Sequence, residues 1–192
     1  MERGRITSWD DMIIFWQYIY KDMNLDPRSL PVMLSTSPTA PRRETERTSE
    51  IFFEDFQVPA LWLANQAVMA LLGTGRITGT ILDSGYGVTH AVPIYQGSVV
   101  QHGIRRWEYA GVDIAQRLQD YVLREHGYRP TRDTLRELVW LRTYVAEDFD
   151  AEMERGGSME RPFALPDGNV LSVGNERYGP VSIQEVINGT VW

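Results

Sequence analysis

The 192-residue sequence contains no cysteine and only three histidines. Without cysteine the chain can form neither a disulfide scaffold nor a thiolate zinc site, and it has no thiol nucleophile. No apolar run approaches the roughly 18 to 20 residues of a membrane-spanning helix, and residues 1–5 lack the apolar stretch of a signal peptide. We therefore expect a reducing cytosolic or nuclear setting and no membrane partner.

A basic excess is also lacking. The 19 lysines and arginines stand against 26 aspartates and glutamates, which gives a formal net charge of −7. Proteins that bind nucleic acid by neutralising phosphates need the opposite balance, so we expect no direct nucleic-acid partner. The chain has 43% hydrophobic, 11% aromatic and 23% charged residues, which indicates an ordinary globular protein and excludes disorder.

The first part of the chain alternates strand and helix patterns. A helix with Ser8 as its cap and Asp10 and Asp11 in its first turn is expected to run to about Lys21. The further elements expected are a strand at residues 31–35, a surface loop at 35–47, a helix carrying Ile51, Phe52 and Phe56, a strand at 59–63, and a helix capped by Asn65 and ended by Gly73. This alternation predicts an α/β layer.

The second part begins with three consecutive strand patterns. They cover residues 78–83, 88–95 and 98–109, and the glycines between them are typical of hairpin turns. An amphipathic helix is expected after Gly111 and before Pro130, followed by a helix from Leu135 to Val145. A last hairpin is expected from strands at residues 163–165 and 170–173 around a turn at 166–169.

One hairpin carries residues with chemical potential. An apolar strand delivers the carboxylate Asp83 to its end, and Gly85 and Gly87 then let backbone N–H groups approach an anion closely. Asp83 can hold a magnesium ion through its water shell. Taken alone, however, an Asp-x-Gly-x-Gly pattern between two strands is more often a tight turn without a ligand.

Several segments of the sequence are similar, in the same order, to segments of the actin family. The resemblance extends from Arg3 to about Tyr178. It rests on residues 6–12 (ITSWDDM), 53–60 (FEDFQVPA), 66–68 (QAV), 82–85 (LDSG), 87–90 (GVTH), 92–95 (VPIY), 110–111 (AG), 144–146 (YVA), 165–168 (LPDG) and 174–177 (GNER).

The resemblance implies an actin-type ATPase fold, in which two ribonuclease-H-like α/β lobes clamp Mg-ATP or Mg-ADP between two phosphate-binding hairpins. By position, it implies a magnesium-side carboxylate at Asp83, a phosphate hairpin with Gly85 and Gly87, water positioning by Gln66 and His90, and a glycine beside the nucleoside at Gly111. A neutral amide and an imidazole are groups that can orient an attacking water.

The resemblance also implies that the fold is incomplete. Residues 1–74 correspond to the C-terminal portion of the first lobe, and residues 75–111 to the β-meander of the second lobe with its phosphate hairpin. Residues 112–192 correspond to a helix of the second lobe and a mostly present, smaller inserted subdomain with a divergent tail. The first phosphate hairpin and part of the adenine site have no counterpart, and catalysis needs both halves of the clamp.

Three residues depart from the actin pattern where the nucleoside binds. Tyr86 replaces an aspartate that contacts the ribose, and Val139 and Trp140 replace a Lys-Glu pair that embraces adenine and ribose. Each lost hydrogen bond to a charged group is worth about 1.5–3 kcal/mol, so we expect ATP binding and hydrolysis to be impaired or absent. Trp140 is expected to fill the vacated space with apolar surface.

Three functional hypotheses remain open. The favoured one is a cytoplasmic, cytoskeletal actin-family protein, also compatible with the nucleus, whose partners are actin, other actin-family subunits and actin-binding proteins. The second is a non-catalytic actin-related interaction module of a larger complex. The third is an incomplete product of an actin-like gene without independent activity.

Overall fold

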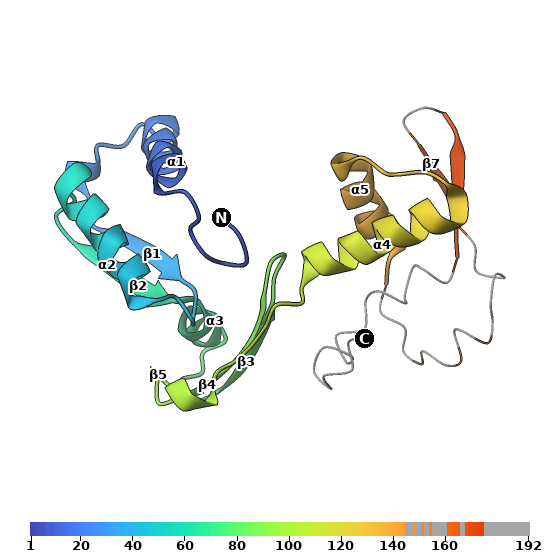
Figure 1. Cartoon of the computed structure of the whole chain (residues 1–192). Coiled ribbons are helices and arrows are strands. Elements are labelled where there is room, and N and C mark those ends of the chain that lie inside the picture. Colours follow the sequence, from blue (N-terminus) through green and yellow to red (C-terminus); the bar gives the residue numbers. More distant parts are fainter. Residues whose placement is uncertain (145–147, 149–150, 152–153, 155–160, 166–167, 175–192) are drawn as a thin grey trace. The chain divides into compact units, whose positions relative to one another are not determined.

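The computed structural model describes residues 1–144, 148, 151, 154, 161–165 and 168–174 (Figure 1). The chain forms two compact units, Met1–Glu108 and Tyr109–Trp192. Helices and strands are mixed in both, which confirms the predicted α/β class. None of the helices in the described segments has the length and apolar character to cross a bilayer.

The first unit begins with the predicted alternation of helix and strand. Helix α1 covers Trp9–Asp22, and the Ser8 hydroxyl accepts a hydrogen bond from the Asp11 N–H at 3.3 Å, as the capping pattern predicts. Strands β1 (Val32–Thr36) and β2 (Leu61–Asn65) pair in parallel, from Val32 opposite Leu61 to Thr36 opposite Asn65. Helix α3 (Gln66–Gly73) follows β2 directly.

The connection between β1 and β2 differs from the prediction. Helix α2 covers Arg42–Glu50, so the expected loop ends at Pro41. Its arginines and glutamates are good helix formers, and Arg42 donates to Glu46 one turn later at 2.7 Å. The next turn, Ile51–Asp55, is a π-helix.

The core of this part lies where the π-helical turn meets α1. Trp16, Ile51, Phe52, Phe56 and Val58 are buried there. The rings of Trp16 and Phe52 pack edge to face with centroids 4.8 Å apart. This core holds α1 and α2 next to the parallel pair of strands.

An antiparallel meander completes the first unit. It consists of β3 (Gly79–Ser84), β4 (Thr89–Tyr95), β5 (Ser98–Val99) and β6 (Arg105–Trp107), and both β5 and β6 pair with β4. One face of this meander buries Val92 and Ile94 against Ala67 and Leu71 of α3.

The prediction of one continuous third strand at residues 98–109 was wrong. A 3₁₀ turn, Gln101–Gly103, separates β5 from β6 opposite Pro93. On this side of β4 the Pro93 carbonyl accepts from the Val100 N–H at 2.9 Å, but proline has no N–H to return, so the ladder lacks one hydrogen bond where β5 ends. The chain instead passes so close that a Cβ on Gly103 would lie 2.6 Å from Pro93 Cγ.

The second unit combines two helices with a hairpin. Helix α4 (Gly111–His126) ends at Gly127, and α5 (Arg132–Arg142) begins after its cap Thr131. Strands β7 (Arg161–Ala164) and β8 (Val170–Val173) pair antiparallel, as predicted. Their shared core consists of Leu118, Val122, Leu135, Leu138, Phe163, Leu165, Leu171 and Val173. Val145, at the end of the expected second helix, and residues 166–167 of the expected turn lie outside the described residues.

The expectation for Trp140 was wrong. Its side chain is 84% exposed on α5. Leu135, Leu138 and Val139 take the helix positions that face the core, so residue 140 points away from it. Trp140 therefore fills no space within the described structure.

Candidate functional site

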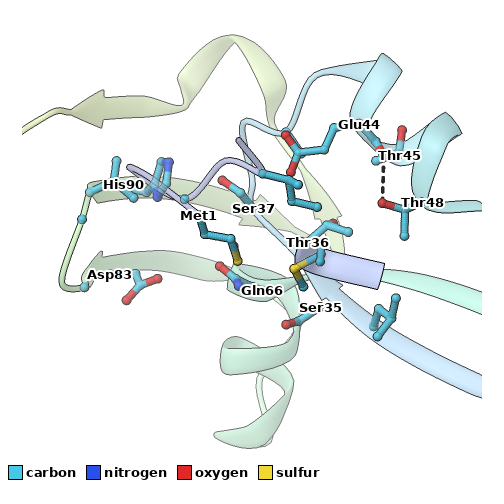
Figure 2. A pocket seen from close by; sticks show the side chains of 18 of the residues that line it. Met1, Ser35, Thr36, Ser37, Glu44, Thr45, Thr48, Gln66, Asp83 and His90 are labelled. Carbon is cyan, nitrogen blue, oxygen red and sulfur yellow. Dashed lines mark hydrogen bonds between the residues drawn. The ribbon is translucent and has the colours of Figure 1, made fainter. Parts of the chain in front are cut away.

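A cavity of about 290 Å³ lies within the first unit (Figure 2). It opens at the carboxyl ends of β1 and β2, where ligands commonly bind in sheets with parallel strands. The β3–β4 hairpin and α2 supply further walls. The lining residues are Met1, Gly4, Ile6, Met12, Trp16, Leu34, Ser35, Thr36, Ser37, Ala40, Glu44, Thr45, Thr48, Gln66, Asp83, Gly85, Tyr86, Gly87, Val88 and His90.

Most residues that the sequence singled out come together here. Gln66, Asp83, Gly85, Gly87 and His90 all line the cavity, although up to 24 positions of sequence separate them. The sixth candidate, Gly111, is the first residue of α4 in the second unit and does not line it.

Local structure explains how three of these side chains are positioned. The Asn65 side chain accepts from the N–H groups of Ala67 and Val68, which fixes the start of α3 and with it Gln66. Asp83 and His90 face each other across β3 and β4. Figure 2 shows these two side chains on the two strands, with Gln66 at the start of a helix.

The hairpin between β3 and β4 is closed by its own hydrogen bonds. The Gly85 N–H donates to the Val88 carbonyl at 3.1 Å, and the Ser84 and Thr89 hydroxyls lie 2.9 Å apart. The two strands are therefore held in one register up to the turn. The sequence predicted that both glycines leave room for an anion.

Gly87 lies against the chain's own N-terminal residues. A Cβ at this position would lie 3.2 Å from the Arg3 Cα and 3.3 Å from the Arg3 nitrogen. The Arg3 guanidinium donates to the Gly87 carbonyl at 3.2 Å and to the Glu108 carbonyl at 2.8 Å. The glycine thus makes room for a turn of the chain's own residues 2–5, which two backbone hydrogen bonds between Glu2 and Arg5 close.

His90 is buried, with 2% of its surface exposed. Its Nε2 lies 3.1 Å from the Thr39 hydroxyl and 3.4 Å from Arg106 Nη1. Burial lowers the pKa of His90 and the Arg106 charge lowers it further, while Asp83 and Glu108 act in the opposite direction. His90 is therefore neutral at pH 7.

Arg106 is held by partners on several segments. Its Nη2 donates to the Arg3 carbonyl at 2.7 Å, its Nη1 to the Thr39 hydroxyl at 3.0 Å, and its Nε pairs with Glu108 at 2.8 Å. The hydrogen bond from Arg106 holds the pKa of the Glu108 carboxyl below its usual range. These contacts fix the guanidinium beside His90.

Sequence reasoning missed both Arg106 and Thr39. Arg106 lies opposite His90 across β4 and β6, so correct strand register would have found it. Thr39 lies in the loop between β1 and α2, where no local pattern signals which side chain turns inward.

The charge and size of the cavity limit what it can hold. Its lining residues, all within the described part of the chain, include Glu44 and Asp83 but neither lysine nor arginine. No group of three or more acidic or histidine side chains among the described residues is arranged to hold a metal ion. The volume lies below the roughly 300–1,000 Å³ of sites that enclose larger organic ligands. The described lining of the cavity thus offers hydroxyl, amide and carboxylate groups and no lysine or arginine side chain.

The sequence model of the family described as Actin matches residues 1–134. The chain belongs to the actin family. The matched residues include all six candidate positions, from Gln66 to Gly111, while Val139 and Trp140 lie beyond the match.

Proposed function

We propose that this chain is a cytoskeletal actin-family protein of the cytoplasm, a filament subunit or filament partner, in which ATP binding and hydrolysis are impaired or absent. The observation that carries the proposal is the actin match over residues 1–134. Its partners would be actin, other actin-family subunits and actin-binding proteins. Residues 1–74 would belong to the first actin lobe, 75–111 to the meander of the second, and 112–192 to its helix and inserted subdomain.

By family position, six residues would contribute to a nucleotide site. Asp83 would be the magnesium-side carboxylate, and Gly85 and Gly87 would form the phosphate hairpin. Gln66 and His90 would orient water. Gly111 would lie beside the nucleoside, on a different unit of the chain from the other five.

The chemistry of the cavity supports weak nucleotide binding. Phosphates concentrate negative charge, and here they would meet Glu44 and Asp83 with no lysine or arginine among the lining residues of the described cavity. Tyr86 stands at the hairpin in place of a carboxylate, and 63% of its surface is exposed. Val139 packs against the core of the second unit and offers no polar group.

A thermal shift measurement with Mg-ATP tests the nucleotide part of the proposal. A ligand present at its own Kd stabilises the protein by about 0.4 kcal/mol, and one at 100 times its Kd by about 2.7 kcal/mol. At about 1 mM Mg-ATP we expect the stabilisation to exceed that measured with magnesium alone by no more than the first value. A shift near the second value would contradict the proposal.

Co-sedimentation with complete actin filaments tests the filament part. We expect the chain to pellet with filaments in proportion to their concentration and to remain in the supernatant without them. Pelleting that is independent of filaments indicates self-aggregation, and no pelleting in their presence contradicts the filament proposal.

A second candidate is a non-catalytic interaction module of a larger complex. Helix α1 favours it, because Ile14, Phe15 and Tyr18 are exposed on the side opposite the buried Trp16. A helix that is apolar on both sides is typical of one that is covered in an assembly. If the chain does not bind filaments, we expect the Phe15→Ser variant to keep its fold and to lose binding to the larger complex of which the chain is a module.

A further inference from the structure

The ring of His90 lies at the end of a hydrogen-bonded chain that crosses three segments of the first unit. The chain runs from Arg106 on β6 through Thr39 in the β1–α2 loop to His90 on β4. We propose that Thr39 and Arg106 are positioning residues that hold His90 as its Nδ1–H tautomer, so that the ring offers the cavity a hydrogen-bond donor and no acceptor. Only the identity of the ligand in the cavity rests on the proposed function.

The direction of each hydrogen bond follows from the donors available. A guanidinium has N–H groups and no acceptor, so Arg106 Nη1 donates both to the Thr39 hydroxyl at 3.0 Å and toward His90 Nε2 at 3.4 Å. The Thr39 hydroxyl hydrogen has two possible acceptors, Ser37 Oγ at 3.4 Å and His90 Nε2 at 3.1 Å, and we assign it to the nearer one, Nε2. Nε2 is thus the acceptor of both contacts and carries no proton.

The charged form of the ring does not fit these contacts. Protonated histidine has two N–H donors and no acceptor, so its Nε2–H would face the Arg106 guanidinium, which can only donate. It would also place a second positive charge next to Arg106 in a buried place. The neutral ring with its proton on Nδ1 satisfies every contact, since the hydrogen bond at one nitrogen decides which nitrogen is protonated.

Arg106 can impose this arrangement because its own position is fixed. Its side chain is 15% exposed, and it is bonded at the same time to the Arg3 carbonyl at 2.7 Å and to Glu108 at 2.8 Å. A guanidinium held on two sides loses little further freedom when it bonds a third group. The turn at residues 2–5 and strand β6 therefore both contribute to the orientation of His90.

The tautomer gives different hydrogen-bonding roles to Gln66 and His90, the two residues assigned to water positioning. Nδ1–H can donate to an oxygen in the cavity, but a ring whose only lone pair is already bonded cannot take up a proton from water. Of the pair Gln66 and His90, only Gln66 offers an acceptor, its amide carbonyl. His90 would thus orient an oxygen, of water or of a small anion, and would not act as a base.

The tautomer can be measured directly by nitrogen NMR on the full chain labelled with ¹⁵N-histidine, at a slightly alkaline pH and without ligand. The nitrogen shifts separate protonated from unprotonated ring positions. With only His90, His102 and His126 in the sequence, the His90→Gln variant assigns the signals. We expect His90 to carry its proton on Nδ1, the opposite of the preference of a histidine side chain in water. A proton on Nε2, or an equal mixture, would overturn the proposal.

Variants of Thr39 test its role separately from folding. Thr39→Val removes the hydroxyl at similar volume, and we expect the share of the Nε2–H form to rise; Thr39→Ser keeps the hydroxyl and should restore the wild-type spectrum. Thr45→Val is the matched control, because it removes the same hydroxyl from a residue of the same type, which lines the cavity but donates to the Arg42 carbonyl and not to His90. An unchanged His90 spectrum in a folded Thr39→Val chain would refute the role of Thr39. Nucleotide and filament binding play no part in these measurements, so the proposed function can fail without affecting them.

Discussion

Replacing each glycine of the β3–β4 hairpin by alanine should have opposite effects on stability. At Gly87 the new Cβ would lie 3.2 Å from the Arg3 Cα and 3.3 Å from the Arg3 nitrogen, and backbone atoms cannot rotate away. Overpacking of this kind costs about 1–3 kcal/mol, and the lower entropy of the unfolded alanine chain offsets about 0.4–1 kcal/mol. Gly87→Ala should therefore destabilise the first unit by about 0.5–2 kcal/mol.

Gly85→Ala is the matched control two residues away. Its Cβ would have only the Val88 carbonyl oxygen nearby, at an ordinary 3.7 Å, so the entropic gain should dominate and stability should stay equal or rise by up to about 1 kcal/mol. Neither glycine has a positive φ, so alanine meets no backbone strain at either position.

Urea unfolding of the full chain, followed by tryptophan fluorescence, measures this difference. Four of the six tryptophans, Trp9, Trp16, Trp62 and Trp107, lie in the first unit and report on it. A shift of the Gly87→Ala midpoint to lower urea, with Gly85→Ala unchanged or higher, is the expected pattern. Equal midpoints for the two variants, or the reverse order, would refute the packing of Arg3 against Gly87.

Three further predictions concern the core, a helix cap and pH. Phe52→Ala should cost about 3–5 kcal/mol in urea unfolding, because the ring is buried against Trp16, whereas the half-exposed Phe53 tolerates alanine with a much smaller loss. Asn65→Ala removes the cap of α3 and should cost about 1 kcal/mol by the same assay; a loss no larger than that of an exposed polar residue would argue against the cap. The pKa of His90 in the folded chain lies below the ordinary value of 6.5, so the unfolded chain takes up a proton at this residue before the folded chain does. The stability that neutral His90 contributes is therefore complete above pH 6.5, and it is lost as the pH falls through the pKa of the folded state. Unfolding midpoints measured from pH 7.5 down to pH 5 should fall, and His90→Gln should flatten that slope; an equal slope in the variant would contradict it.

Much of the fold could be predicted because its signals are local. The Ser8 cap, the Asn65 cap and the hairpin of β7 and β8 each depend on residues within a few positions of one another, and the structure has all three. The predictions from the sequence failed where residues far apart in the chain determine the local structure. The third meander strand is interrupted opposite Pro93, which lacks an N–H for the ladder on that side, and nothing within residues 98–109 signals this neighbour.

The site shows the same division. Local pattern and family resemblance together identified five residues that the fold brings to one cavity. The sequence did not identify Thr39 and Arg106, because their role depends on where Nε2 of His90 points after folding. The sequence did not identify Arg3 either, because the backbone of Arg3 lies against Gly87, which is 84 positions away.

The glycines of the β3–β4 hairpin do not by themselves make an anion site. The missing side chain at Gly87 leaves a space, and the backbone and guanidinium of Arg3 occupy its surroundings. An anion also needs positive charge, and both nearby arginines are bonded to the protein itself. Arg3 donates to the carbonyls of Gly87 and Glu108, and Arg106 bonds Thr39, Glu108 and the Arg3 carbonyl. The charge that borders the hairpin therefore stabilises the fold and orients His90, while the cavity itself keeps the carboxylates Asp83 and Glu44. The same contacts that hold this actin-family hairpin together are the physical basis for proposing that it binds nucleotide weakly.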